Sequence, residues 1–314
     1  MSTLTEVLLK KLAWTNSKTA STPVACSGSG SRTRVNEKEL SLLLNRLKPY
    51  VERFPALAFA YRTMRDARAF QRQRPRVTPY GFLCMGNSAM ARGDYEPEEA
   101  ALAQELLGEA DVFVDVGANI GFFSCLARSA GKQTVAVEPL AQNLDYLYAN
   151  LDANGWNDVE VNPIGLGDRP GIATLYGGGA GASLIRGWAG ASSLLKRKVS
   201  ISTLDILVGE RFLGKRMFIK VDVEGTEFAL LRGAENILRR TPAPIWIMEI
   251  GLTEHHPEGF NPEFAGTFDI FWNNGYRSWT ADARRRAITR EDVENWVNTR
   301  KKEFGGRNYL FKKG

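Results

Sequence analysis

A glycine-containing turn and a downstream glutamate are the residues whose types and spacing point most directly to ligand chemistry. The turn, residues 115–121, reads Asp-Val-Gly-Ala-Asn-Ile-Gly and follows a β-branched run. Gly117 and Gly121 allow tight turning and a close approach of the backbone to a ligand. Glu138 stands seventeen residues after Gly121, and a carboxylate there can accept hydrogen bonds from both hydroxyls of a ribose. The turn and the glutamate together predict a nucleoside ligand.

The same turn argues against a dinucleotide. A nicotinamide-binding GxGxxG turn has a glycine where this chain has Asn119, which disfavours a nicotinamide-dependent dehydrogenase. An adenosine with a free ribose and no pyrophosphate is therefore favoured, and S-adenosylmethionine fits this description. The alternative interpretation of Glu138 is an ordinary strand-end acid on a structural turn.

Three carboxylates between residues 222 and 227 could take a proton from a substrate. Asp222 and Glu224 end a β-branched run, and Glu227 begins the next helical stretch. An alcohol is a poor nucleophile at neutral pH, so transfer of a group to a hydroxyl is expected to need a general base. The alternative is that Glu224 and Glu227 orient the backbone of the turn while the base lies elsewhere.

The two histidines of the chain, His255 and His256, are adjacent. Because an imidazole titrates near neutral pH, His255 is a further candidate base; a surface pair without a role is the alternative. Asp222, Glu249 and His255 could hold magnesium, but adjacent histidines point apart and the ligand set is incomplete. No metal is therefore expected.

Short apolar runs alternate with helical stretches beyond residue 100. Buried strands are predicted at 112–116, 134–137, 159–161, 217–221 and 245–248, helices at 122–130 and 142–154, and weaker strands at 173–176, 199–201 and 309–311. This alternation predicts a parallel sheet with helices on both faces. Ligands bind such sheets beyond the carboxyl ends of the strands, where the turn and the acids fall.

Four motifs in the central part of the chain carry a family resemblance. They read Tyr-Glu-Pro-Glu-Glu at 95–99, Gly-Ala-Asn-Ile-Gly at 117–121, Thr-Leu-Asp at 203–205 and, most specifically, Ile-Lys-Val-Asp-Val-Glu-Gly-Thr-Glu at 219–227. Together they resemble the FkbM-type S-adenosylmethionine-dependent methyltransferases over about residues 80–250. The resemblance implies a class I methyltransferase fold, a Rossmann-like α/β fold with a seven-stranded doubly wound sheet whose last strand is antiparallel. It also implies O-methylation of a hydroxyl on a small molecule, typically a sugar or a natural product.

The resemblance further implies roles for residues at matching positions. The cofactor would be bound by the turn, by the acids that follow it and by their neighbours: Asp115, Gly117, Ala118, Asn119, Gly121, Glu138, Pro139, Asn143, Asp168 and Asp222. Within this set, Glu138 would hold the ribose and Asp168 the adenine amino group. From their own chemistry, and not from the resemblance, the candidate catalytic residues are Asp222, Glu224 and His255.

The sequence is also compatible with other functions. The net charge of +6 prompts a methyltransferase acting on RNA, and a protein substrate is a further alternative. Base-methylating enzymes usually carry an Asp/Asn-Pro-Pro-aromatic motif where this chain reads Asp-Val-Glu-Gly at 222–225, so no nucleic-acid partner is expected. A non-catalytic adenosine-binding protein of the same fold is disfavoured, because packing alone would not require three carboxylates there.

The charge is unevenly distributed along the 314 residues. Residues 46–76 hold nine Lys and Arg against two acidic residues, which leaves the remainder close to neutral. We predict a flexible N-terminal segment at 1–34, a basic helical lead-in at 35–78 and a methyltransferase domain at 79–314. The N-terminal helices could join two copies of the chain.

The cysteines and the hydropathy pattern indicate the compartment. Cys26, Cys84 and Cys125 are odd in number and widely spaced, which argues against a disulfide framework or a zinc site. No apolar run reaches the length of a membrane-spanning helix. We therefore expect a cytoplasmic protein.

Overall fold

The computed structural model describes residues 70, 73–191, 193 and 195–314. The predicted segment 1–34 and most of the lead-in 35–78, with its arginine-rich face, lie outside the described residues. At the end of the lead-in, β1 (Arg76–Val77) pairs antiparallel with β2 (Leu83–Cys84). In the described ranges no helix is both long and apolar enough to cross a membrane.

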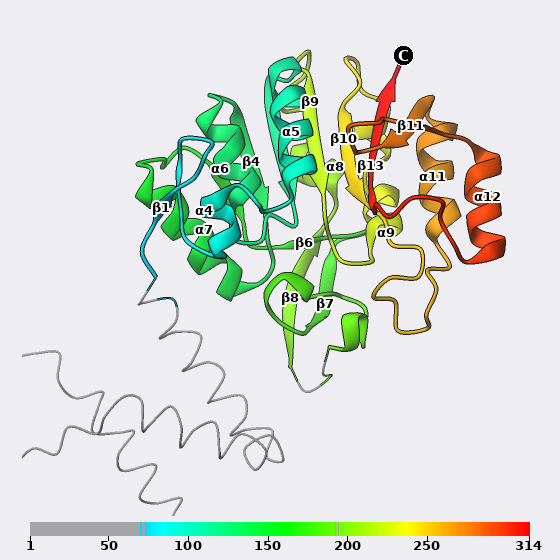
Figure 1. The fold of residues 1–314 in the computed structure, drawn as a ribbon, viewed down its shortest axis with the longest axis horizontal. Coiled ribbons are helices and arrows are strands. Elements are labelled where there is room, and N and C mark those ends of the chain that lie inside the picture. The colour runs from blue at the N-terminus through cyan, green and yellow to red at the C-terminus, as the bar shows by residue number, and fades with distance from the viewer. Residues whose placement is uncertain (1–69, 71–72, 192, 194) are drawn as a thin grey trace, which may run out of the picture. The chain divides into compact units, whose positions relative to one another are not determined.

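An eight-stranded sheet forms the centre of the fold (Figure 1). Its strands are β3 (Val112–Val116), β4 (Gln133–Val137), β5 (Glu160–Asn162), β9 (Met217–Val221), β10 (Ile245–Glu249), β11 (Tyr276–Thr280), β12 (Ala287–Ile288) and β13 (Asn308–Lys313). They lie in the order β12-β11-β13-β10-β9-β3-β4-β5. The first of them in sequence, β3, lies between β4 and β9, so the chain order reverses there. This reversal is the switch point at which doubly wound sheets bind ligands.

The strand directions confirm the predicted class I arrangement. Neighbouring pairs from β5 to β10 are all parallel. β13 is antiparallel to both β10 and β11. The two-residue strand β12 pairs with β11 and adds an eighth strand at the edge to the seven expected.

Two hydrophobic cores explain why these strands read as continuous apolar runs. Val112, Val114 and Val116 enter one core, whereas Phe113 enters the other. Because successive side chains of a strand point to opposite faces, a strand covered on both sides must be apolar at nearly every position.

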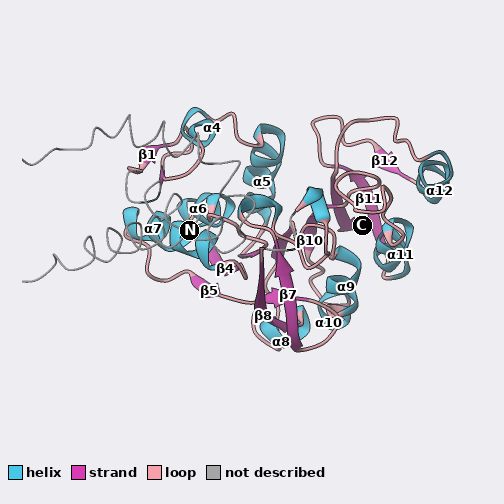
Figure 2. Ribbon diagram, turned by 90° about the horizontal axis from the view of Figure 1, so that it is seen from below, coloured by secondary structure: helices cyan, strands magenta, loops and turns pink. Residues whose placement is uncertain are grey.

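Helices cover both faces of the sheet, as Figure 2 shows for α5 and α6 on one side and α9 and α10 on the other. The first layer contains α4 (Ser88–Arg92), α5 (Pro97–Glu109), α6 (Phe122–Ser129) and α7 (Ala141–Ala153), and the second contains α8 (Leu204–Val208), α9 (Glu227–Arg232), α10 (Glu235–Leu238), α11 (Phe264–Asn273) and α12 (Arg290–Thr299). The turn after β3 leads directly into α6, so it lies at the carboxyl-end edge of the sheet.

A second sheet lies beyond the carboxyl ends of the central strands (Figure 1). It contains β6 (Gly165–Leu166), β7 (Gly171–Tyr176) and β8 (Lys196–Ser202). The weaker strands predicted at 173–176 and 199–201 therefore pair with each other and do not join the central sheet. Exposed residues along both strands explain the difference, because the central sheet takes strands that are buried on both faces. We call residues 163–203, which carry this sheet, the insertion.

Candidate active site

A cavity of about 260 Å³ lies at the carboxyl-end edge of the parallel strands. Its lining comes from the ends of the central strands, the segment before α5 and the insertion: Tyr95, Glu96, Val116, Gly117, Asn119, Val137, Glu138, Pro139, Asn143, Ile164, Gly165, Leu166, Leu175, Gly179, Ala180, Ala182, Leu184, Asp222, Val223, Glu224, Thr226, Glu249 and Arg307. The strand order therefore arranges the lining from Ile164 after β5, through the β4 and β3 ends, to Glu249 at the end of β10.

The turn after β3 passes close to the end of β9. Gly117 has a φ of +80°, and a Cβ at this position would meet the backbone oxygen of Asp222 at 1.8 Å. Asn119 also has a positive φ, +51°. Both residues line the cavity, so the tight turn that the sequence predicts is present and open to a ligand.

Glu138 stands at the end of β4 and lines the cavity, as do Pro139 and Asn143. One carboxylate oxygen accepts a hydrogen bond from the backbone N–H of Asn119 at 2.8 Å, and the other accepts one from Leu140, also at 2.8 Å. Burial raises the pKa of Glu138 to about 7, against the opposing effect of these two hydrogen bonds. The two hydrogen bonds thus hold the Glu138 carboxylate beside the turn after β3, and the carboxylate keeps acceptor capacity for a ligand.

Four of the predicted cofactor residues do not line the cavity. Asp115 is buried inside the sheet layer and accepts a hydrogen bond from the Ser124 hydroxyl at 2.6 Å. Ala118 packs into the core, and a Cβ at Gly121 would lie 2.9 Å from Leu147, so this glycine permits packing of the turn against α7. Asp115, Ala118 and Gly121 therefore pack toward the protein interior and support the turn without lining the cavity.

Asp168 is exposed and lies away from the cavity lining. The chain leaves β5 at Asn162 and enters β6, which pairs with β8 of the insertion. Gly167 then passes close to Gly233 at the end of α9, where a Cβ would meet the Gly167 oxygen at 2.1 Å. The structure therefore does not bring Asp168 into the cavity lining that contains Glu138.

The two ends of the cavity differ in chemistry. The end beside β4 and β5 is largely apolar, with side chains from both the central sheet edge and the insertion: Val137, Ile164, Leu166, Leu175, Ala182 and Leu184. The end beside β9 and β10 carries the carboxylates of Glu96, Asp222, Glu224 and Glu249. We call these the apolar end and the acidic end.

Two cations balance part of the acidic end. The Lys220 ammonium lies 3.3 Å from the Asp222 carboxylate and 4.6 Å from the centre of the Phe123 ring. Burial alone would lower the pKa of Lys220, but Asp222 and Glu96 raise it above its usual range. Arg307 lies 3.0 Å from Glu249. Burial, and then the Asp222 carboxylate, raise the pKa of Glu249.

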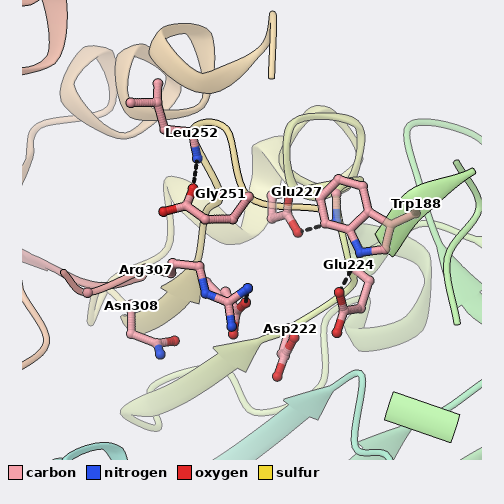
Figure 3. A network of polar contacts seen from close by, with 12 residues as sticks. Trp188, Asp222, Glu224, Glu227, Gly251, Leu252, Arg307 and Asn308 are labelled. Carbon is pink, nitrogen blue, oxygen red and sulfur yellow. Dashed lines mark hydrogen bonds and ion pairs between the residues drawn. The ribbon is translucent and has the colours of Figure 1, made fainter. Parts of the chain in front are cut away.

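The sequence left open whether Glu224 and Glu227 act as bases or orient the backbone of the turn, and the structure places the two residues differently. Glu224 lines the cavity and receives a hydrogen bond from the Trp188 indole at 2.6 Å (Figure 3). Burial and the nearby Asp222 charge raise the pKa of Glu224 to about 7. Glu227 is buried away from the cavity and accepts a hydrogen bond from the Gly225 N–H at 2.8 Å, so it orients the backbone of the turn.

His255 is not brought to the cavity. It is exposed, has a φ of +65°, and its ring centre lies 6.1 Å from that of Trp188. Within the described part of the chain, no group of three or more His, Cys, Asp or Glu side chains could hold a metal ion. The set Asp222, Glu249 and His255 is therefore not assembled as a ligand group.

Sequence reasoning gave no role to three important residues of the site. Glu96 belongs to the motif at 95–99, which entered only as part of the resemblance. Arg307 precedes β13 and reaches the acidic end because that strand runs antiparallel beside β10. Trp188 comes from the insertion. Neither Arg307 nor Trp188 stands in a recognisable motif, so no signal in a single sequence identifies them.

Solved structures of known proteins show distant similarity to the chain. The chain is similar in structure to a SAM-dependent methyltransferase from Agrobacterium tumefaciens (10% identity; 77% of this chain and 70% of that chain; TM-score 0.41). It is also similar to an O-methyltransferase from Bacillus cereus in complex with SAH (11%; 68% and 79%; 0.38) and to precorrin-6y C5,15-methyltransferase from Geobacter metallireducens (12%; 69% and 85%; 0.35). No curated protein sequence matches the chain significantly.

The sequence pattern of a protein family provides the decisive match. The methyltransferase FkbM domain matches residues 115–278, from Asp115 near the end of β3 into β11. This range covers more than half of the 314 residues and includes Glu138, Asp222 and Glu224. The chain belongs to the FkbM methyltransferase family.

Proposed function

We propose that this protein is an S-adenosylmethionine-dependent O-methyltransferase that acts on a hydroxyl group of a small molecule such as a sugar or another natural product. The observation that carries the proposal is that one cavity has an apolar end, where Glu138 stands at the end of β4, and an acidic end. An adenosine suits the first end, and a cationic methyl donor beside a hydroxyl suits the second.

The residues present fit the cofactor. Glu138 keeps acceptor capacity for a ribose hydroxyl, because the two backbone donors and the Asn143 side chain use three of the about four acceptor sites of its carboxylate. Gly117 and Asn119 expose backbone beside it. When bound, S-adenosylmethionine supplies a methyl group carried on a positively charged sulfur. The four carboxyl groups of the acidic end line the cavity, and a positive charge bound there favours their ionised forms.

Glu224 is the proposed proton acceptor. A general base works best when its pKa is near the working pH, and the pKa of Glu224 is about 7. Asp222 and Glu249, in contrast, each form an ion pair with a cation, Lys220 and Arg307 respectively. Glu224 therefore takes the proton of the acceptor hydroxyl, while the walls of the cavity position that hydroxyl and exclude water.

The proposal is tested by letting the protein label its acceptor. The full chain is incubated with deuteromethyl-labelled S-adenosylmethionine and separate pools of small metabolites, RNA and protein, and each pool is analysed by mass spectrometry. We expect a labelled methyl ether in the metabolite pool, strongly reduced with Glu224→Gln and retained with the exposed-residue control Glu98→Gln. Label on RNA or on protein, or on nitrogen or carbon of a small molecule, would overturn the proposal.

A further inference from the structure

The insertion is attached to the acidic end of the cavity through a single tryptophan and a serine. The Trp188 indole N–H donates to the Oε2 atom of Glu224 at 2.6 Å. The Ser183 hydroxyl donates to the backbone oxygen of the same glutamate, also at 2.6 Å. Both donors are buried. Side chain and backbone of Glu224 are therefore both held by the insertion, and Figure 3 shows the contact between Trp188 and the Glu224 side chain.

The shape of the β9–α9 turn depends on this attachment. Glu224 has a φ of +55°, which costs free energy for a residue with a side chain. The next residue, Gly225, has a φ of +100°, and a Cβ there would lie 2.4 Å from the Trp188 ring. The indole thus occupies space that only a glycine leaves open.

The other side of Trp188 is covered by the loop that holds the two histidines. The ring centres of His255 and His256 each lie 6.1 Å from that of Trp188. The backbone oxygen of His255 accepts a hydrogen bond from Ala189, the residue after the tryptophan, at 2.8 Å. Trp188 therefore contacts both the β9–α9 turn and the loop of the two histidines, whose rings pack beside its own.

The partner of Glu224 differs in kind from the partners of the neighbouring acids. Lys220 contacts Asp222, and Arg307 contacts Glu249, so both of those carboxylates face cations. A neutral N–H donor orients the Glu224 carboxylate without pairing it with a positive charge. In the described part of the chain, the Oε1 atom of Glu224 accepts no hydrogen bond, and the residue lines the cavity.

We propose that Trp188 is a positioning residue: its indole N–H holds the Glu224 carboxylate so that Oε1 faces the acceptor hydroxyl. The role of Glu224 rests on the function proposed above. In that reaction Glu224 takes the proton of the hydroxyl as the acceptor oxygen takes the methyl group, and the electron pair of the broken carbon–sulfur bond stays on the sulfur. The proton then leaves to solvent, and Trp188 itself exchanges no proton.

A first experiment needs no acceptor. In the 15N-labelled full chain, the indole cross-peak of Trp188 is assigned by its loss in Trp188→Phe, and its pH titration is recorded by NMR. We expect a midpoint near pH 7, because burial and Asp222 place the pKa of Glu224 at about 7. The titration should disappear in Glu224→Gln, whose side chain still accepts the hydrogen bond. Trp272 is the matched control, since its indole donates to the Ser278 hydroxyl at 2.9 Å and should not titrate.

Other titrating groups surround this pair and set the condition for overturning the proposal. They are Lys220 of β9, Asp222 directly after β9, Glu227 of α9, Glu249 of β10, Arg307 before β13, and His255 and His256 beside the indole. A Trp188 titration that persists in Glu224→Gln and disappears when both histidines are replaced by Gln would assign the signal to the imidazoles. That result, or a Trp188 signal that does not titrate, would overturn the proposal.

A second experiment measures the effect on turnover. Trp188→Phe keeps the aromatic ring but removes the N–H, and it is assayed on the metabolite fraction that the wild-type protein labels. We expect kcat to fall about tenfold or more, with the affinity for S-adenosylhomocysteine within about twofold of wild type by calorimetry. The acidic limb of the kcat profile should move to higher pH, because the lost hydrogen bond lowered the pKa of Glu224.

Two outcomes separate this inference from the proposed function. An unchanged kcat and pH profile in Trp188→Phe, with Trp272→Phe as the matched control, would overturn the positioning role even if O-methylation is observed. If the wild-type chain labels no hydroxyl, the proposed function fails, while the NMR titration still decides whether Trp188 holds an ionising Glu224.

Discussion

Gly117 lies against the backbone of Asp222, so close that a Cβ on the glycine would come within 1.8 Å of the Asp222 oxygen. The contact joins the turn after β3 to the end of β9, the two strands between which the chain order reverses. It also places the turn that would bind the proposed cofactor directly against the residues that would face the proposed acceptor.

Replacement of Gly117 by alanine should therefore destabilise the protein. The new methyl group must displace the β9 turn, and φ of +80° is unfavourable for alanine, so we expect the free energy of unfolding to fall by at least about 2 kcal/mol. Urea denaturation measures the change. Gly131→Ala is the matched control, because Gly131 has a similar φ, +73°, with no atom near the added Cβ; it should cost only about 1 kcal/mol. Equal losses in the two variants would show that the contact does not matter.

Cofactor affinity should depend on Glu138. Glu138→Gln keeps the size of the side chain but loses the negative charge for the ribose hydroxyls, and we expect S-adenosylhomocysteine to bind about tenfold more weakly. Because burial raises the pKa of Glu138 to about 7, wild-type affinity should also fall as the pH drops below this value, and the variant should lack that dependence. Isothermal calorimetry at several pH values tests both points, with Glu98→Gln as control. Unchanged affinity in Glu138→Gln would remove this residue from the binding site.

Stability should fall as the pH rises through the acidic range, and Glu227 allows a direct test. Burial raises its pKa from 4.5 to about 7 in the folded state, so the folded protein binds the proton more tightly than the unfolded chain does. The stabilisation from this group is complete below pH 4.5 and is lost as the pH rises to about 7, by up to about 1.4 kcal/mol per pH unit.

The isosteric variant Glu227→Gln should remove this part of the slope, since the amide oxygen can still accept from Gly225. Chemical denaturation between pH 4.5 and pH 7 compares the two proteins. Glu98→Gln, at an exposed position, should follow the wild-type curve. The idea would be wrong if Glu227→Gln and wild type lost stability in parallel.

Turnover should distinguish the candidate bases. We expect Glu224→Gln to lower kcat by about 10²–10⁴, the usual contribution of a positioned base. His255→Ala should lower it by less than about tenfold, because His255 is exposed and acts only through its packing on Trp188. Single-turnover assays with labelled cofactor measure both. A larger effect in His255→Ala than in Glu224→Gln would return the imidazole to the role of base.

The central sheet was predictable because its strands are buried on both faces. Residues 112–116 and 217–221 contain apolar side chains at nearly every position, and both form strands in the expected places. Glu138 was predictable for a related reason: a strand end followed by a helix fixes where its carboxylate lies. Spacing along the chain is enough when the residues belong to one strand–turn–helix unit.

The rest of the site depends on contacts that the sequence does not encode locally. Residues 173–176 look like a strand of the central sheet, but their neighbour is β8 of the insertion. Asp168 leaves the cavity because the chain enters β6 shortly after β5 ends. Trp188 and Glu224 are far apart in sequence and meet only because the insertion folds over the acidic end.

The position of β13 has a consequence for biosynthesis. β11 and β12 reach the central sheet only through β13, which follows both of them in the chain. Arg307, which precedes β13, also completes the acidic end of the cavity. While a ribosome is still translating residues 308–313, the nascent chain can pair β3, β4, β9 and β10. The place between β10 and β11 stays empty until β13 fills it. The proposed cofactor-binding surface can therefore form on the nascent chain before the cavity is complete.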